Sequence, residues 1–149
     1  MSTALVWFRR DLRLADHPAL CQAAARHQQV IPVYLHAPHE EAPWSPGAAS
    51  RWWLHQSLTA LTAALESHGL RLIIRQGDSL KLLRELLSET GATAVYWNRL
   101  YEPAIIDRDR VVKAALRGAG FSAESSQAEL LIEPWTLLKT DQTPYQVFT

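Results

Sequence analysis

The stretch Ala4-Leu5-Val6-Trp7-Phe8, followed directly by Arg9-Arg10-Asp11-Leu12-Arg13, decides the fold of this 149-residue chain. A continuous apolar run of this length is typical of a β-strand that is covered by helices on both faces. The arginines and the aspartate after it mark the point where the chain leaves the core for solvent. The run therefore predicts a central strand of a parallel sheet, with a polar loop at its carboxyl end.

The rest of the chain continues this pattern, because short apolar runs alternate with longer amphipathic stretches. We predict further strands at 30–35, 70–75, 94–98 and 121–125, although Pro32 removes one backbone donor from the second. We predict helices at about 18–26, 47–68 and 103–117, and another after the turn at 77–78 with Leu80, Leu83 and Leu87 inward. Asp16 is the predicted N-cap of the first helix, and residues 36–46 are a predicted loop. The alternation predicts an α/β fold, a doubly wound, Rossmann-like sheet of five mainly parallel strands with helices on both faces.

Composition excludes several classes of protein. The 15 Lys and Arg residues balance 15 Asp and Glu residues, so the chain lacks the basic surplus of a dedicated nucleic-acid binder. Cys21 is the single cysteine, which rules out an internal disulfide and is typical of a reducing, cytoplasmic setting. No apolar run approaches the roughly 20 residues of a membrane span. We therefore expect a cytoplasmic domain with no membrane partner.

Three predicted loops leave the carboxyl ends of strands, where open parallel sheets bind their ligands. They cover residues 8–13, 36–44 and 98–102. Together they gather guanidinium, imidazole, carboxylate, amide and aromatic groups at one edge of the sheet, which suits a planar polar ligand with anionic arms. The alternative is that Arg9, Arg10, Asp11 and Arg13 form only a structural ion-pair cluster.

The signatures of common enzymes are missing. The chain has no G-x-G-x-x-G after its first strand, no P-loop and no G-x-S-x-G nucleophile elbow. None of its histidines forms an H-E-x-x-H motif, and His36 and His39 in a loop are typical of solvated surface rather than of a metal site. We therefore expect no metal and no complete catalytic constellation within this chain.

Six tryptophans are unusual for this length. Trp7 and Trp97 lie in predicted strands and are expected in the core. Trp52 and Trp53 are neighbours on a helix, about 100° apart, so at most one can point fully inward. The other, with Trp44 in the preceding loop, is a candidate stacking face for a ligand. The alternative is that these side chains cover a helix end or contact another domain.

Four ordered motifs give the chain a family resemblance. Residues 5–14 (LVWFRRDLRL), 47–54 (GAASRWWL), 95–109 (VYWNRLYEPAIIDRD) and 145–149 (YQVFT) resemble the DNA photolyase/cryptochrome family, over essentially the whole chain. Within the family, the resemblance is strongest to the branch of cyclobutane-dimer photolyases near plant cryptochromes. The resemblance implies that residues 1–149 are the family's N-terminal α/β antenna domain.

The resemblance also implies a larger protein. The aromatic C-terminal segment 133–149 ends abruptly, and we expect that the chain was cut from a longer one whose helical FAD-binding domain is absent here. The implied parent is a deoxyribodipyrimidine photo-lyase that repairs cyclobutane pyrimidine dimers by light-driven electron transfer. This chain alone would be inactive, and it would reach damaged DNA only through its parent and the missing helical domain. The alternatives are a cryptochrome blue-light receptor and a free-standing α/β nucleotide-binding module.

The task implied for this domain is to hold a light-harvesting chromophore. Relatives that use a deazaflavin carry acidic residues where this chain has Ala37 and Leu100, and many folate-binding members carry Asn-Glu where it has Ala104-Ile105. The resemblance of segment 40–53 favours methenyltetrahydrofolate in a differently built pocket, with an empty site as the alternative. The candidate cofactor-binding residues are Phe8, Arg9, Arg10, His36, Glu40, Glu41, Trp44, Trp52, Asn98, Tyr101 and Glu102.

Overall fold

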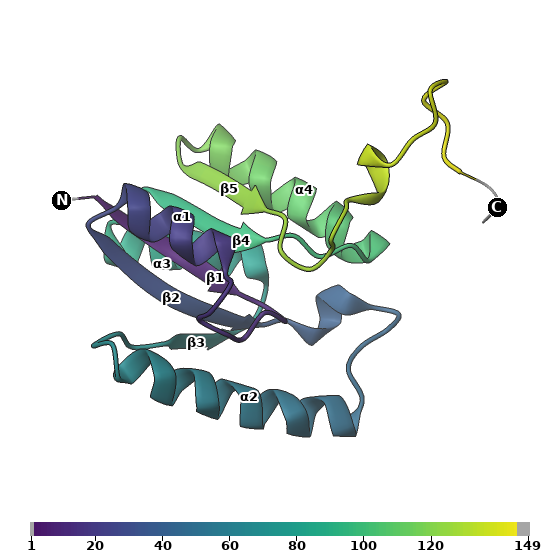
Figure 1. Cartoon of the computed structure of the whole chain (residues 1–149). Coiled ribbons are helices and arrows are strands. Elements are labelled where there is room, and N and C mark those ends of the chain that lie inside the picture. The colour runs from purple at the N-terminus through teal and green to yellow at the C-terminus, as the bar shows by residue number, and fades with distance from the viewer. Residues whose placement is uncertain (1, 146–149) are drawn as a thin grey trace.

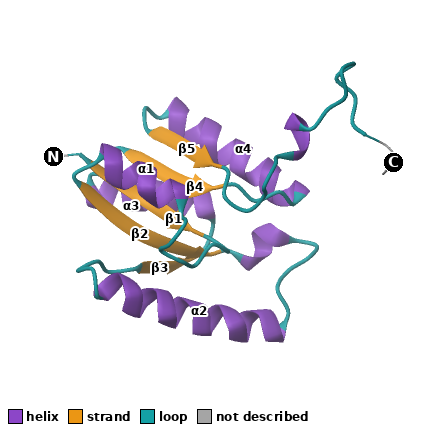
Figure 2. Cartoon of the chain, in the orientation of Figure 1, coloured by secondary structure: helices purple, strands orange, loops and turns teal. Residues whose placement is uncertain are grey.

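The computed structural model of the chain describes residues 2–145 and is built around one sheet. The strands are β1 (Thr3–Phe8), β2 (Gln29–His36), β3 (Ile73–Gln76), β4 (Ala94–Asn98) and β5 (Ser122–Ser126). Their order in the sheet is β3-β2-β1-β4-β5, and all four pairings are parallel (Figures 1 and 2). This order confirms the predicted doubly wound sheet, with β1 at its centre.

The helices cover both faces of the sheet. They are α1 (Pro18–Arg26), α2 (Ala48–Glu66), α3 (Ser79–Thr90) and α4 (Pro103–Gly118). On one face, Ala23 of α1 and Leu65 of α2 pack on Val6 and Phe8. On the other face, Leu83 of α3 and Leu116 of α4 belong to the same buried cluster as Leu5 and Trp7. Alternate residues of β1 therefore enter two separate cores, as expected of a strand buried on both sides.

The helix ends are set by local chemistry, and one predicted cap is wrong. Asp78 caps α3 as predicted, since its carboxylate accepts a 2.8 Å hydrogen bond from the Lys81 backbone N–H. The N-cap of α1 is His17, whose Nδ1 accepts from the Leu20 backbone N–H, and not Asp16. Asp16 has a positive φ of 50° and turns the chain instead, so the imidazole behind it takes over the cap.

Two predicted segments differ in detail. The third strand is shorter than the prediction of 70–75, because it begins at Ile73 and ends at Gln76. The predicted loop after β2 contains one short 3-10 helix, η1 (Pro38–Glu41). Pro32 stays within β2, and pairing with β3 starts only one residue later, at Val33. The missing donor of Pro32 therefore does not break the strand.

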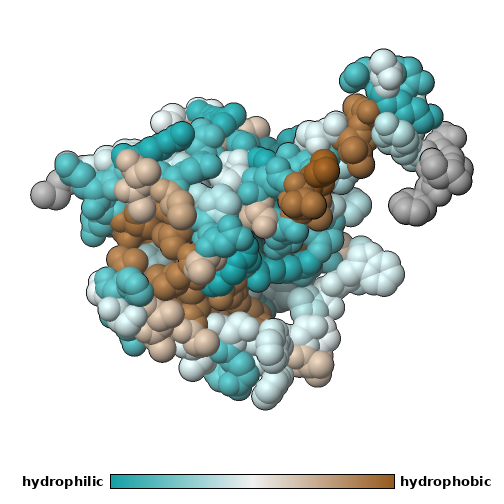
Figure 3. Space-filling model, viewed as in Figure 1, coloured by the Kyte–Doolittle hydropathy of each residue, from teal (hydrophilic) through white to brown (hydrophobic). Residues whose placement is uncertain are grey.

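The C-terminal part of the described chain extends away from the sheet (Figure 1). It contains the 3-10 helix η2 (Pro134–Thr136), and its large apolar side chains are exposed, with Leu131 at 96%. A second group of apolar residues reaches the surface between α1 and α2 (Figure 3). Residues 146–149 of the fourth family motif lie outside the described residues. Among residues 2–145, no helix combines the length and the apolar character needed to cross a bilayer.

Candidate functional site

A cavity of about 870 Å³ lies at the carboxyl ends of β1 and β2, beside the first turns of α2. Arg10, Tyr34 and His36 line it from the sheet side, and Trp44 and Trp52 line it from the opposite side. Leu100 from the β4–α4 connection and Arg108 from α4 also line it. A cavity of this size is large enough for a cofactor-sized ligand. Parallel topology explains its position, because the loops after β1, β2 and β4 all leave the sheet at the same edge.

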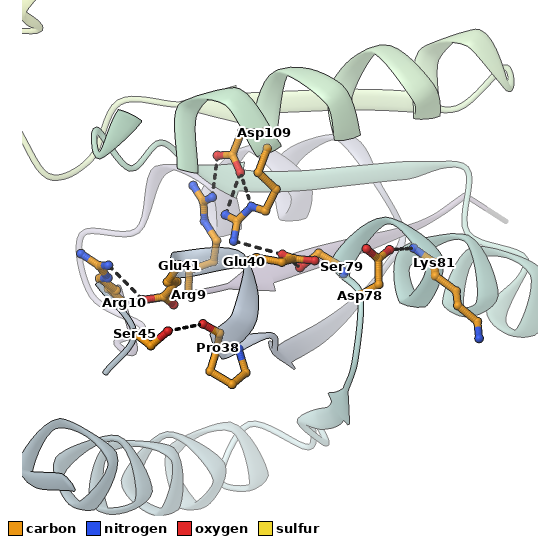
Figure 4. Close-up of polar contacts among 11 residues, drawn as sticks. Arg9, Arg10, Pro38, Glu40, Glu41, Ser45, Asp78, Ser79, Lys81 and Asp109 are labelled. Carbon is orange, nitrogen blue, oxygen red and sulfur yellow. Dashed lines mark hydrogen bonds and ion pairs between the residues drawn. The ribbon is translucent and has the colours of Figure 1, made fainter. Parts of the chain in front are cut away.

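Arg10 stands at the rim of this cavity between two carboxylates. It forms an ion pair with Glu41 at 3.3 Å (Figure 4). A second ion pair joins it to Glu102, just before α4. Burial acts to lower the pKa of Arg10, but Glu102 and Glu41 outweigh burial and raise it. The side chain is half exposed. Arg10 thus connects the β1, β2 and β4 loops, while its own charge is already neutralised.

Arg9 is buried beneath the cavity and connects β1 to the end of β4 and to α4. Its guanidinium forms a 2.5 Å ion pair with Asp109 of α4 and donates a hydrogen bond to the Asn98 carbonyl. It also lies 5.1 Å from the ring centre of Trp7, a cation–π contact. Burial lowers the pKa of Arg9, and the nearby Asp109 carboxylate acts in the opposite direction. Its contacts are those of a structural residue, although its side chain also lines the cavity.

Asn98 forms a buried polar cluster with Asp11 and His17. Its side-chain amide donates a 2.6 Å hydrogen bond to Asp11 and accepts a 3.1 Å bond from the Ala19 backbone N–H. The imidazole of His17 lies 2.9 Å from Asp11. Burial acts to raise the pKa of the Asp11 carboxyl, but hydrogen bonds from His17, the Arg9 backbone N–H and Asn98 lower it overall. The cluster fixes the β1 loop to the start of α1.

Glu40 joins the β2 loop to α3 and α4. Its carboxylate accepts hydrogen bonds from the backbone N–H and the hydroxyl of Ser79, at 2.7 and 2.6 Å, and lies 3.5 Å from Arg108 (Figure 4). His39 and Asp78 bring further ligand-type atoms within 4.8 Å of Glu40. Both Glu40 oxygens are already engaged, so this group serves as a structural support and gives no basis for a metal centre.

The tryptophans form two groups, one in the core as the sequence predicts and one exposed at the start of α2. Trp7 and Trp97 are buried, with ring centres 5.9 Å apart. Trp52 and Trp53 are both exposed, at 62% and 67%, and both line the cavity. This agrees with the limit that at most one of them can point fully inward, and α2 buries Leu61 and Leu65. With Trp44, which is 86% exposed, they give the cavity an aromatic wall.

Tyr34 lies at the end of β2, where its phenol faces the cavity. Burial and the Glu41 carboxylate raise its pKa to about 12, and Arg10 acts against them. The phenol is therefore a neutral hydrogen-bonding group at ordinary pH, next to the charged Arg10 and Glu41 on the cavity wall.

The structure brings six of the predicted site residues to the cavity wall: Arg9, Arg10, His36, Glu41, Trp44 and Trp52. Glu102 reaches the cavity only through Arg10. Four others have different surroundings: Phe8 is fully buried, Glu40 and Asn98 act as supports, and the Tyr101 hydroxyl donates to Glu133 at 2.9 Å.

Sequence reasoning missed Tyr34, Trp53, Leu100 and Arg108 as lining residues. A signal for Arg108 did exist. It lies in the first turns of the helix that follows β4, and those turns start at the same edge of the sheet as the predicted loops.

The chain is thus an α/β domain of the Rossmann-like class, with an aromatic and ionic cavity at the strand ends where such sheets bind ligands. The family model for DNA photolyase matches residues 4–149, and the chain belongs to the DNA photolyase family. It corresponds to the N-terminal α/β domain of that family, which confirms the resemblance of the sequence motifs. This assignment does not favour a free-standing nucleotide-binding module.

Curated relatives and solved structures agree with this assignment. The chain is 44% identical to a deoxyribodipyrimidine photo-lyase of Agrobacterium fabrum, covering 97% of the chain and 30% of the relative. It is 41% identical to cryptochrome-2 of Arabidopsis thaliana, covering 97% and 24%. A crystal structure of a class III photolyase from Agrobacterium tumefaciens superposes with a TM-score of 0.91, at 43% identity, covering 99% of this chain and 30% of that one.

A second solved structure is the archaeal photolyase from Sulfolobus tokodaii with two FAD molecules, for which a novel light-harvesting cofactor is implied. It has a TM-score of 0.81 and 27% identity, covering 92% of this chain and 32% of that one. The chain therefore spans roughly a third or less of the length of each of these relatives.

Proposed function

We propose that this chain is the light-harvesting domain of a DNA photolyase and that the cavity at the ends of β1 and β2 holds its antenna chromophore. The observation that carries the proposal is the cavity itself, at the ligand-binding edge of the sheet, in a member of the photolyase family. An antenna has to keep a fixed distance and orientation to the group that it excites. Strand ends tied together by Arg9, Asn98 and Glu40 provide such a rigid frame.

The residues of the cavity fit methenyltetrahydrofolate. Its flat, conjugated ring system needs aromatic faces, and Trp44, Trp52 and Trp53 offer three that are largely exposed. Its methenyl bridge is cationic, and Glu41, which shares Arg10 with Glu102, presents a carboxylate on the cavity wall. When bound, such a chromophore supplies near-ultraviolet absorption and the excitation that is passed on. The chain's own residues would stack it, orient it and shield it from water.

We further propose that the whole protein is a deoxyribodipyrimidine photo-lyase of the cytoplasm. In it, a helical FAD-binding domain would contact damaged DNA and carry out the light-driven repair of cyclobutane pyrimidine dimers. The relatives are about three times as long as this chain, which leaves room for such a domain. The chain carries equal numbers of acidic and basic residues, which supports the proposal that it does not itself bind DNA. Alone, it would harvest light without repairing dimers.

A titration of the purified chain with methenyltetrahydrofolate, followed by the fluorescence of the chromophore, tests the antenna proposal. Trp44→Ala should weaken binding at least about fivefold, equivalent to about 1 kcal/mol, the scale of one aromatic contact. Trp135→Ala removes an exposed tryptophan that does not line the cavity and should leave the affinity unchanged. Equal affinities for the three proteins would overturn the proposed site. Failure of the whole protein to repair dimers under blue light, with the chromophore bound, would point to a cryptochrome instead.

A further inference from the structure

A second cavity, of about 370 Å³, lies beside the first, between α2 and the edge strand β3. The two cavities have Tyr34, His36 and Leu54 in common, so their walls are continuous. The two cavities are therefore direct neighbours along α2.

The second cavity differs from the first in its charge. Arg51 and Arg75 line it together with His36 and His55, and none of its lining residues in the described part of the chain carries a carboxylate. Arg75 lies 3.5 Å from Glu89, in a pair whose members are both about half exposed. Arg51 donates to the Pro46 carbonyl, and within residues 2–145 it has no carboxylate within ion-pair distance.

The cations of the first cavity are already paired. Arg10 is held by Glu41 and Glu102, Arg9 by Asp109, and Arg108 by Glu40 and Asp109. An anionic part of a ligand would have to break these pairs to bind there. At the second cavity it would meet Arg51 without displacing a carboxylate, so electrostatics favours the second cavity for negative charge.

We propose that the second cavity binds a flexible anionic tail of the chromophore whose ring system occupies the first cavity. This inference rests on the proposed function, because it takes the first cavity as the chromophore site. Two kinds of chromophore share this chemistry. A folate can carry a poly-γ-glutamate tail with one carboxylate per residue, and a dinucleotide flavin carries a diphosphate. Arginines bind both kinds of anion well, because their planar fork matches carboxylate and phosphate oxygens.

Paired titrations of the full chain distinguish the two sources. One pair compares the monoglutamate and pentaglutamate forms of methenyltetrahydrofolate, and the other compares riboflavin and FAD. We expect the tailed member of one pair to bind at least about threefold more tightly than its short partner, given the modest strength of partly exposed charge pairs. The pair that shows the preference identifies the tail as polycarboxylate or diphosphate.

The double variant Arg51→Gln/Arg75→Gln assigns the effect to the second cavity. It should bind the tailed and the short ligand equally, with the affinity of the short ligand kept within about twofold of the unsubstituted chain. Arg71→Gln removes an exposed arginine just before β3 that lines neither cavity, and it should keep the preference. Circular dichroism of each variant checks that the fold is intact.

Two results would overturn the inference while the chromophore site stands: short ligands that bind as tightly as tailed ones, or a preference that survives the double substitution. If no folate and no flavin binds at all, the proposed function itself fails, and the inference fails with it.

Discussion

Replacing Asn98 by alanine tests the idea that a buried polar cluster fixes the loops around the cavity. The side chain is 2% exposed, and it satisfies two groups that water does not reach, the Ala19 backbone N–H at 3.1 Å and the Asp11 carboxylate at 2.6 Å. Leaving a buried polar group unsatisfied costs about 1–3 kcal/mol, and somewhat more for a charged one. Asp11 keeps its contacts with His17 and the Arg9 backbone N–H, so the main loss is the partner of the Ala19 N–H. Asn98→Ala should therefore lower the free energy of unfolding by about 1–3 kcal/mol, against about 5–15 kcal/mol for a typical domain.

Urea denaturation followed by circular dichroism measures this loss. Gln22→Ala, at an exposed position of α1, serves as the control and should change the free energy of unfolding by less than about 0.5 kcal/mol. Asn98→Asp keeps an acceptor for Ala19 but sets a second carboxylate beside Asp11. The loss of stability in Asn98→Asp should become smaller at acidic pH, where one of the two carboxyls is protonated. A loss below about 1 kcal/mol for Asn98→Ala would refute the structural role of the cluster.

Two further predictions concern ionisation near the cavity. Because the pKa of Asp11 is lower in the folded chain than its ordinary value, its stabilising contribution is present above the unfolded pKa and is lost as the pH falls through the folded one. Urea midpoints measured at descending acidic pH should therefore fall less steeply for Asp11→Asn than for the unsubstituted chain, and parallel curves would contradict this. The Tyr34 phenol should ionise only near its pKa of about 12, and Glu41→Gln should lower that pKa. Ultraviolet titration, with Tyr34→Phe subtracted, checks both statements, and an unchanged pKa in Glu41→Gln would exclude the proposed influence of Glu41.

Much of the fold follows from local sequence. The apolar run at 4–8 predicts β1 within one residue of its observed start, because a strand buried on both faces needs apolar residues at every position. Asp78 and Gly91 bound α3 through a side-chain cap and a left-handed residue, and both are local devices. The missed cap of α1 had a local cause as well, since Asp and Asn are the usual caps and histidine is rarely considered.

The candidate site depends more strongly on tertiary contacts. Sequence placed Arg10, Glu41 and Glu102 in three loops, but only the folded chain pairs them and so neutralises Arg10. Asn98 was a candidate ligand residue, and the fold instead directs its amide toward Asp11 and α1. Residue type alone does not distinguish these roles, because the same polar group binds a ligand or supports a loop according to what faces it.

The sequence by itself therefore determined the order and class of the elements, the central strand and the edge of the sheet where the cavity lies. Hydrophobic patterning and caps are local, and parallel topology carries all strand ends with their loops to one side. Only the tertiary structure decided which charges are free. Arg9 pairs with Asp109, which lies 100 residues away, and Arg51 has no carboxylate partner within residues 2–145. Both facts depend on distances that no local pattern encodes.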